Sequence, residues 1–471
     1  MSPTAKASRV STTAQQRSIL AVCLIAAFFS PFLGAALNLS ISEISRQLNC
    51  GATTVTWVVN AYTIALAVFV VPFGHLADVA SRRRLMLIGM AGFVLATLGC
   101  ALSANVTMLI VFRVIQAVAS ALVFTVNIPL LLDTFPANQR GRMLGMSVTS
   151  TYTGLALGPV LGGFLNSAFG WRSIFVLALL LGAGAFLLAR RNVDPDPGRG
   201  EEHPDRTGTL LYVLFVACLM LDLSNWTAGW WSKLLVLISL GLLLLFVKNE
   251  LRADAPVIQV RLFAQDRAYT LSNLAALLNY GATFAIGYSL SIYLQNVKDM
   301  PSSLAGLVLI CQPVVMAGVS TLAGRLSDRI APYKLASFGM LVITAGLLYL
   351  SWLSPQTPLW TIIVSLAVIG LGFGFFSSPN TNAVLSCVDK SHYGEANSIL
   401  GTMRTLGQSS SMVLVLLIFG AYVGNTVITE ADPLLLTQAI RRNLQLSCII
   451  CFIGALISLV RSRAGHSERS K

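Results

Sequence analysis

The chain alternates between long apolar runs and short polar segments along nearly its whole length. A helix needs roughly 20 apolar residues to cross the hydrocarbon core of a bilayer. Because backbone groups within lipid must be hydrogen-bonded inside their own segment, each long run is predicted to be a helix. The pattern predicts an all-α polytopic membrane protein with 14 transmembrane helices. They cover residues 18–40, 54–74, 85–103, 106–131, 143–168, 171–189, 208–224, 230–247, 270–295, 303–323, 335–353, 359–383, 397–423 and 443–460.

The polar segments divide these helices into groups. Residues 192–207 are rich in proline, glycine and acidic residues, which is typical of a solvated linker. In chain order we predict a tail over 1–17, a six-helix bundle over 18–191, a linker over 192–207, two extra helices over 208–248, a connecting segment over 249–269, a second six-helix bundle over 270–460 and a tail over 461–471.

Composition and charge support this interpretation. Hydrophobic residues make up 55% of the chain and charged residues only 11%, and the formal net charge is +13. Of the 32 lysines and arginines, 24 fall in the tails and in the loops on the same side as the tails. Such an excess marks the cytoplasmic side, so both termini are predicted to be cytoplasmic. The basic charge therefore reflects topology, and we expect no nucleic-acid partner.

Two polar loops carry an internal repeat in which Gly-x-Leu-x-Asp is followed by arginine. The second copy lies 250 residues after the first. In the first copy, Gly74 is expected to allow a tight turn at a helix end. Asp78 needs a cationic partner near the membrane surface, and Arg82 and Arg83 are within reach. The matching residues of the second copy are Gly324, Asp328 and Arg329.

The first copy resembles the most specific signature of the major facilitator superfamily, and both copies stand between the second and third spans of a six-span unit. The order of six, two and six spans resembles the fourteen-span drug/proton antiporter branch. This resemblance, over roughly residues 18–460, implies the major facilitator fold, in which two bundles rock about a central cavity. It also implies that the repeated loops close the cytoplasmic side.

A row of glycines marks one face of the fifth predicted helix. Gly154, Gly158 and Gly162 recur every four residues, so a neighbouring helix can approach closely there. Pro159 removes a backbone donor and is expected to bend the helix. The string that ends at Gly163 resembles the antiporter motif of major facilitator exporters. The resemblance implies export and predicts that the ridge lies between the two bundles.

Two arginines lie inside predicted spans, where charge is costly and therefore a functional candidate. Arg113 lies in a stretch that resembles a fourth-span motif of the family, in which the arginine is implicated in proton coupling. Arg404 lies about a third of the way into the thirteenth predicted helix. With these cations, the candidates for substrate binding or coupling are Gln116, Asn38 and Gln312, which suit a mostly apolar cavity.

The acidic residues do not follow the family pattern. Leu33 stands where the first span of the branch carries an aspartate, and Asp222 is the one acidic residue inside a predicted span. Because a buried unpaired cation is expensive, we expect an anion, a water or an anionic substrate group beside the two arginines. The alternative is that backbone carbonyls and side-chain amides satisfy both of them.

Enzymatic chemistry is not predicted. All four histidines lie in predicted cytoplasmic segments, and no Walker loop is present. We expect no metal, no cofactor and no ATP. The predicted function is a secondary active transporter that exports amphiphilic drugs or metabolites across the cytoplasmic membrane, with a proton or another ion as partner. The alternatives are a facilitator or importer of a small anionic or neutral metabolite, and a non-transporting receptor or lipid-handling module.

Overall fold

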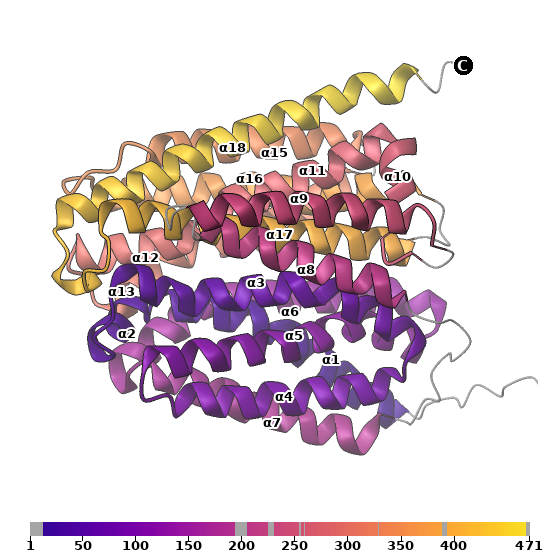
Figure 1. The fold of residues 1–471 in the computed structure, drawn as a ribbon, viewed down its shortest axis with the longest axis horizontal. Coiled ribbons are helices and arrows are strands. Elements are labelled where there is room, and N and C mark those ends of the chain that lie inside the picture. The colour runs from indigo at the N-terminus through magenta and orange to yellow at the C-terminus, as the bar shows by residue number, and fades with distance from the viewer. Residues whose placement is uncertain are drawn as a thin grey trace, which may run out of the picture.

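The computed structural model of the protein describes residues 13–193, 205–224, 230–253, 256–258, 260–327, 329–388 and 393–467. Every regular element in these ranges is a helix, and most helices run along the long axis of the molecule (Figure 1). The first helix, α1 (Thr13–Asn38), begins at the end of the molecule where the last helix, α18 (Pro433–Ser467), finishes. We call this the termini end, and the opposite one the far end.

The first bundle contains α1 and five further long helices, with one short helix at the far end. Their bounds are α2 (Ile41–Gln47), α3 (Ala52–Val79), α4 (Arg82–Ala101), α5 (Val106–Thr134), α6 (Ala137–Phe169) and α7 (Arg172–Asn192). The short helix α2 was not predicted from the sequence.

The second half of the chain contains a helical hairpin and a second bundle. The hairpin is formed by α8 (Arg206–Ser224) and α9 (Trp230–Glu250). The remaining bounds are α10 (Val260–Gln265), α11 (Arg267–Thr283), α12 (Ile286–Asn296), α13 (Ser302–Leu309), α14 (Cys311–Leu326), α15 (Pro332–Leu350), α16 (Leu359–Leu385), α17 (Tyr393–Tyr422), the 3-10 turn η2 (Ile428–Glu430) and α18. In Figure 1 the first bundle is indigo to magenta and the second is salmon to yellow.

The hairpin contacts both bundles through α8. The Tyr212 hydroxyl donates to the carbonyl of Ala67 on α3, over 3.1 Å. Nearer the far end, the hydroxyl of Ser409 on α17 lies 3.4 Å from the sulfur of Met220. The hairpin is therefore packed along the line where α3 and α17 meet.

Ten helices in the described part of the chain are long and apolar enough to cross a membrane: α1, α3, α4, α5, α7, the pair α13–α14, α15, α16, α17 and α18. The other predicted spans fall on α6, α8, α9 and the pair α11–α12. Helix α6 contains many glycine, serine and threonine residues, which lower its mean hydropathy. The chain is thus a multi-pass helical protein, and the count of 14 crossings stays a prediction.

Two predicted spans are not continuous helices. Residues 270–295 correspond to α11 and α12, and residues 303–323 correspond to α13 and α14. At the first break, the amide of Ala285 donates to the hydroxyl of Ser411 on α17 instead of continuing the helical ladder. Near the second break, Pro313 offers no amide proton to the carbonyl four residues before it.

The start of the last helix was predicted too late. The predicted span was 443–460, whereas α18 begins at Pro433. Arg441 and Arg442, expected in a loop, lie inside this helix. Their Nε atoms donate to the carbonyl of Ser351 over 3.1 Å and to the hydroxyl of Tyr422 over 3.2 Å. Their partners come from distant loops and helix ends, which an apolarity pattern does not detect.

Candidate functional site

Backbone groups hold the two bundles together at the far end. The amide of Ala52, at the start of α3, donates to the carbonyl of Thr426 over 2.8 Å. The neighbouring hydroxyl of Thr53 donates to the carbonyl of Gly424 over 2.7 Å. The loop after α17 therefore lies directly against the first turn of α3.

A second set of contacts closes the opposite side of the same interface. The hydroxyl of Ser291 on α12 donates to the carbonyl of Asn38 over 2.6 Å. The hydroxyl of Ser302 donates to the carbonyl of Gly163 on α6 over 3.0 Å, and the amide of Asn166 reaches that hydroxyl over 3.2 Å. These contacts also lie in the far half.

The termini half of the interface differs. Tyr152, midway along α6, forms a hydrogen bond of 3.3 Å with Ser377 on α16. Among the described residues, no other hydrogen bond between the bundles lies nearer the termini end. The remaining hydrogen bonds between the bundles in the described ranges lie in the far half. The interface is therefore closed at the far end.

The predicted position of the 154–163 segment between the bundles holds only in part, because three of its glycines face their own bundle. Gly154, Gly158 and Gly162 all lie against α1. A Cβ on Gly158 would sit 2.6 Å from the Cβ of Ala35, and one on Gly162 would sit 2.5 Å from the Cα of Ala36. Sequence spacing defined the face correctly but did not identify the helix that covers it.

The neighbouring face of α6 does lie between the bundles. The carbonyl of Pro159 lies so close to Gly306 on α13 that a Cβ there would overlap it, and Gly163 meets the backbone of Ser302 in the same way. Consecutive residues are rotated by about 100° around a helix. The motif therefore serves two contacts, one with α1 and one with α13.

The repeated loops are built differently from the prediction. Gly74 lies inside α3, which continues to Val79, so it makes no turn. Arg82 forms an ion pair with Asp133 at the end of α5, and Arg83 donates to the carbonyl of Arg190 over 3.3 Å. Both contacts stay within the first bundle.

Of the four other residues of the repeat, the structure describes Gly324 and Arg329 in full. Gly324 lies inside α14, where a Cβ would be 3.1 Å from the hydroxyl of Ser378 on α16. Arg329 is exposed in the turn that follows. The side chain of Asp78 and the whole of Asp328 lie outside the described residues.

Arg113 is 1% exposed inside the first bundle. Its Nε donates to the carbonyl of Val58 over 3.1 Å and its Nη1 to Oε1 of Gln116 over 2.5 Å. The guanidinium carbon lies 4.1 Å from the ring centre of Tyr62, and the Gln116 amide donates to the hydroxyl of Thr97 over 2.6 Å. Backbone, amide and aromatic groups thus satisfy this cation, which favours the second of the two alternatives for it.

Arg404 has a more open environment. Its Nη2 donates to the hydroxyl of Thr381 on α16 over 2.7 Å, and its guanidinium carbon lies 5.7 Å from the ring centre of Tyr280 on α11. Its Nε is buried without a hydrogen-bond partner. Among the described residues, no carboxylate lies within ion-pair distance of either Arg404 or Arg113.

The other candidates do not join these clusters. Asn38 contributes its carbonyl to the far-end closure, and its side-chain nitrogen lies against Gly287 on α12. The backbone of Gln312 lies against Gly370 on α16. Asp222 is fully buried in α8, and its carboxylate oxygens have no hydrogen-bond partner. The structure therefore pairs Arg113 with Gln116 and places the remaining candidates separately.

The second bundle contains buried amides with unused hydrogen-bonding groups. Asn279 on α11 is fully buried, and neither its amide nitrogen nor its oxygen has a partner. Asn380 on α16 donates to the carbonyl of Ser272 over 3.3 Å, but its oxygen is unpaired. Unpaired buried polar groups cost free energy, and such groups recur where waters or ligands bind.

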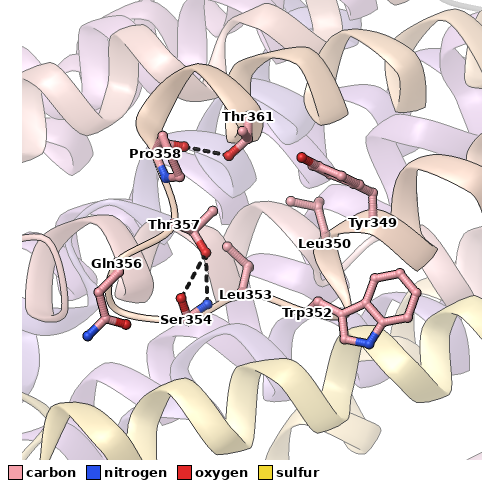
Figure 2. A pocket seen from close by; sticks show the side chains of 9 residues that line it. All are labelled: Tyr349, Leu350, Trp352, Leu353, Ser354, Gln356, Thr357, Pro358 and Thr361. Atoms are coloured by element: carbon pink, nitrogen blue, oxygen red, sulfur yellow. Dashed lines mark hydrogen bonds between the residues drawn. The ribbon is translucent and has the colours of Figure 1, made fainter.

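Two pockets lie at the far end, away from the candidates. Figure 2 shows the first, between α15 and α16, where the amide of Ser354 donates to the hydroxyl of Thr357 and Thr361 donates to the carbonyl of Pro358. The second is a polar groove between the bundles, lined in part by Asn166 and Ser302. None of the five predicted substrate or coupling residues lines either pocket.

Two helical bundles, an interface closed at one end and polar groups inside each bundle are the features of a membrane transporter of the alternating-access class. The family model described as Major Facilitator Superfamily matches residues 23–412. The chain belongs to this superfamily.

Known relatives extend over most of the chain. The riboflavin transporter RibZ of Clostridioides difficile is 27% identical, covering 94% of this chain and 97% of that protein. The uncharacterized transporter YebQ of Escherichia coli is 30% identical, with 83% and 86% covered. The multidrug resistance protein Stp of Mycobacterium tuberculosis is 28% identical, with 85% and 75% covered.

The fold also has relatives among solved structures. A bacterial homologue of the human lysosomal transporter Spinster, in an inward-facing and unoccupied conformation, superposes with a TM-score of 0.68 at 15% identity. The match covers 96% of this chain and 98% of that one. Identity this low supports the fold alone.

Proposed function

We propose that the protein is a secondary active exporter of amphiphilic drugs or metabolites in the cytoplasmic membrane. The observation that carries the proposal is the asymmetric interface between the bundles. Hydrogen bonds between the bundles close the far half. In the described residues, no such bond lies nearer the termini end than the one between Tyr152 and Ser377. Relatives named for multidrug and methylenomycin A resistance support export.

The proposed topology gives this asymmetry a direction. With 14 crossings and both termini in the cytoplasm, the closed far end faces outward, so the structure represents a state closed on the outer side. The excess of basic residues near the termini end supports this orientation. An exporter in this state would load its cargo from the cytoplasm or the inner leaflet.

The gating roles are divided between rigid and moving contacts. Gly154, Gly158 and Gly162 join α1 to α6 as one rigid unit, whereas Pro159 and Gly163 form the contact with α13 that must open at the far end. The repeated loops, with Arg82 and Arg83 in the first copy and Gly324 and Arg329 in the second, would meet when the termini end closes.

We assign the substrate contact to Arg404, because its unpaired Nε keeps hydrogen-bonding capacity that a cargo group can use. A carboxylate or phosphate would form a charge-assisted bond there. The buried amides in the same bundle supply further polar contacts. The preferred cargo is therefore an amphiphile with one anionic group, and Arg113 with Gln116 acts in coupling or positioning inside the first bundle.

The test uses proteoliposomes with anionic, neutral and cationic dyes of similar size. Arg404→Gln is expected to reduce transport of the anionic dye about tenfold, in line with the loss of one charge-assisted hydrogen bond, and to change neutral dye transport little. Arg404→Lys, which keeps the charge, should recover part of the loss. Strong export of cationic dye that Arg404→Gln leaves unchanged would contradict the proposal.

A second candidate is transport of a metabolite without efflux. The relative named as a riboflavin transporter, aligned over 94% of the chain, favours it. Inverted and right-side-out vesicles separate the two directions. Uptake of riboflavin by right-side-out vesicles, with no efflux of dyes, would establish the metabolite function instead.

A further inference from the structure

Two carboxylates meet where the hairpin α8–α9 ends at the termini end of the molecule. Asp205 stands just before α8, and Glu250 is the last residue of α9. Figure 1 shows these helix ends on the same side of the molecule as α10. The site lies outside the predicted spans, and its place on the cytoplasmic side rests on the topology proposed above.

The side chains are held in place by separate contacts. Oδ1 of Asp205 accepts from the amide of Gly208 over 2.8 Å, and Oδ2 accepts from the side chain of Asn249 over 2.6 Å. Oε2 of Glu250 accepts from the amide of Ile258 over 2.9 Å. Glu250 thereby fixes the connecting segment that leads from the hairpin into the second bundle.

One carboxylate oxygen is left over. Glu250 is 2% exposed, and its Oε1 is buried without a partner. A Cβ placed on Gly208 would overlap both this Oε1 and Oδ2 of Asp205. The two oxygens therefore both lie close to the same point in space, beside the bare Cα of the glycine.

No cation among the described residues neutralises the pair. On α8 and α9 the nearest basic residues, Arg206 and Lys248, are exposed, as is Arg252 beyond them. Arg261 donates to the carbonyl of Leu251. Asp254 lies outside the described residues.

Burial raises the pKa of Glu250 to about 7. The charge of Asp205 acts in the same direction, and the amides of Ile258 and Val257 oppose both. Two ionised carboxylates beside the same glycine repel each other, so one proton bound by the pair relieves the repulsion.

We propose that Glu250 and Asp205 form a proton-binding pair, in which protonated Glu250 donates from Oε1 to Oδ2 of Asp205. The bound proton holds the hairpin closed against the connecting segment. Because α8 contacts both bundles, loss of the proton loosens an element that spans their interface. The pair is a sensor of cytoplasmic pH, separate from the cargo site.

The direction of the pH effect follows from the raised pKa. The stabilising contribution of the protonated form is complete below the ordinary glutamate value of 4.5 and is lost as the pH rises through about 7. The folded protein should therefore be more stable on the acidic side of neutrality.

The test measures the melting temperature of the full chain in nanodiscs between about pH 5.5 and about pH 8.5. The wild-type value is expected to fall by roughly 2 °C across this range. Glu250→Gln keeps both hydrogen bonds without titrating and should remove the slope. Asp205→Asn removes the neighbouring charge and should move the midpoint to lower pH. Glu430→Gln, an exposed far-end control, should leave the slope unchanged.

Infrared difference spectra between the two ends of this pH range supply a second measurement. A protonated-carboxyl signal that disappears in Glu250→Gln supports the pair. A wild-type melting temperature without pH dependence, or a slope that survives in Glu250→Gln, would overturn it. Stabilisation by Mg²⁺ or Na⁺ at the alkaline end, in place of the proton, would overturn it as well.

Discussion

The buried arginines of the two bundles differ in how completely their hydrogen-bonding groups are satisfied. In the first bundle, Arg113 is surrounded by a carbonyl, an amide oxygen and an aromatic ring. In the second, Arg404 and Asn279 keep atoms without partners. Both arginines look alike in the sequence, as cations inside apolar runs. Only their surroundings separate an arginine whose hydrogen bonds are satisfied from one that keeps an unpaired Nε.

The largest expected effect tests the rigidity of the first bundle. Gly158→Leu should reduce transport at least about tenfold without preventing insertion, because the side chain would collide with Ala35 and force α1 away from α6. Transport is measured in proteoliposomes at matched protein levels. Gly184→Leu on α7 is the control, since that glycine is exposed and has no atom within 4 Å of a Cβ. Normal transport by Gly158→Leu would show that transport does not require the close contact between α1 and α6.

Replacing Arg113 tests whether its network is structural. Arg113→Met removes a second donor from the carbonyl of Val58, which lies within α3, and leaves Oε1 of Gln116 without this donor, at about 1–3 kcal/mol for the unpaired oxygen. The melting temperature should fall, and Arg113→Lys should recover little because lysine lacks the guanidinium fork. A stable Arg113→Met protein that has lost only its ion dependence would assign the arginine to coupling alone.

The smallest expected effect concerns the partner of Arg404. Thr381→Val removes the hydroxyl that accepts from Nη2, at nearly constant volume. We expect the KM for an anionic cargo to change about two- to fivefold, the size of one lost hydrogen bond, with kcat retained. Thr149→Val on α6 is the matched control, because its exposed hydroxyl bonds only within its own helix. Equal effects of the two variants would argue against a cargo site at Arg404.

The long apolar runs predicted the bounds of most helices to within a few residues, because a membrane-spanning helix has to be apolar along its whole length. They failed where polar residues interrupt the first turns of a helix, as Gln438, Arg441 and Arg442 do in α18. The pair of Arg113 and Gln116 was predictable because residues three apart share a helix face. The contact between Thr381 and Arg404 was not predictable, because Thr381 lies on another helix. The pairing of Glu250 with Asp205 was equally hidden, because 45 positions separate two acids that the α8–α9 hairpin brings together.

Several hydrogen bonds of the far-end closure use main-chain carbonyls and amides, at Ala52, Thr426, Asn38 and Gly163, and the hydroxyls of Ser291 and Ser302 supply two of the partners. Every residue type supplies these groups except for the missing amide of proline. Mutations at such positions can accumulate without abolishing closure, provided that the backbone path is kept. A chain of this kind can change the side chains inside its bundles during evolution while it retains the same far-end seal.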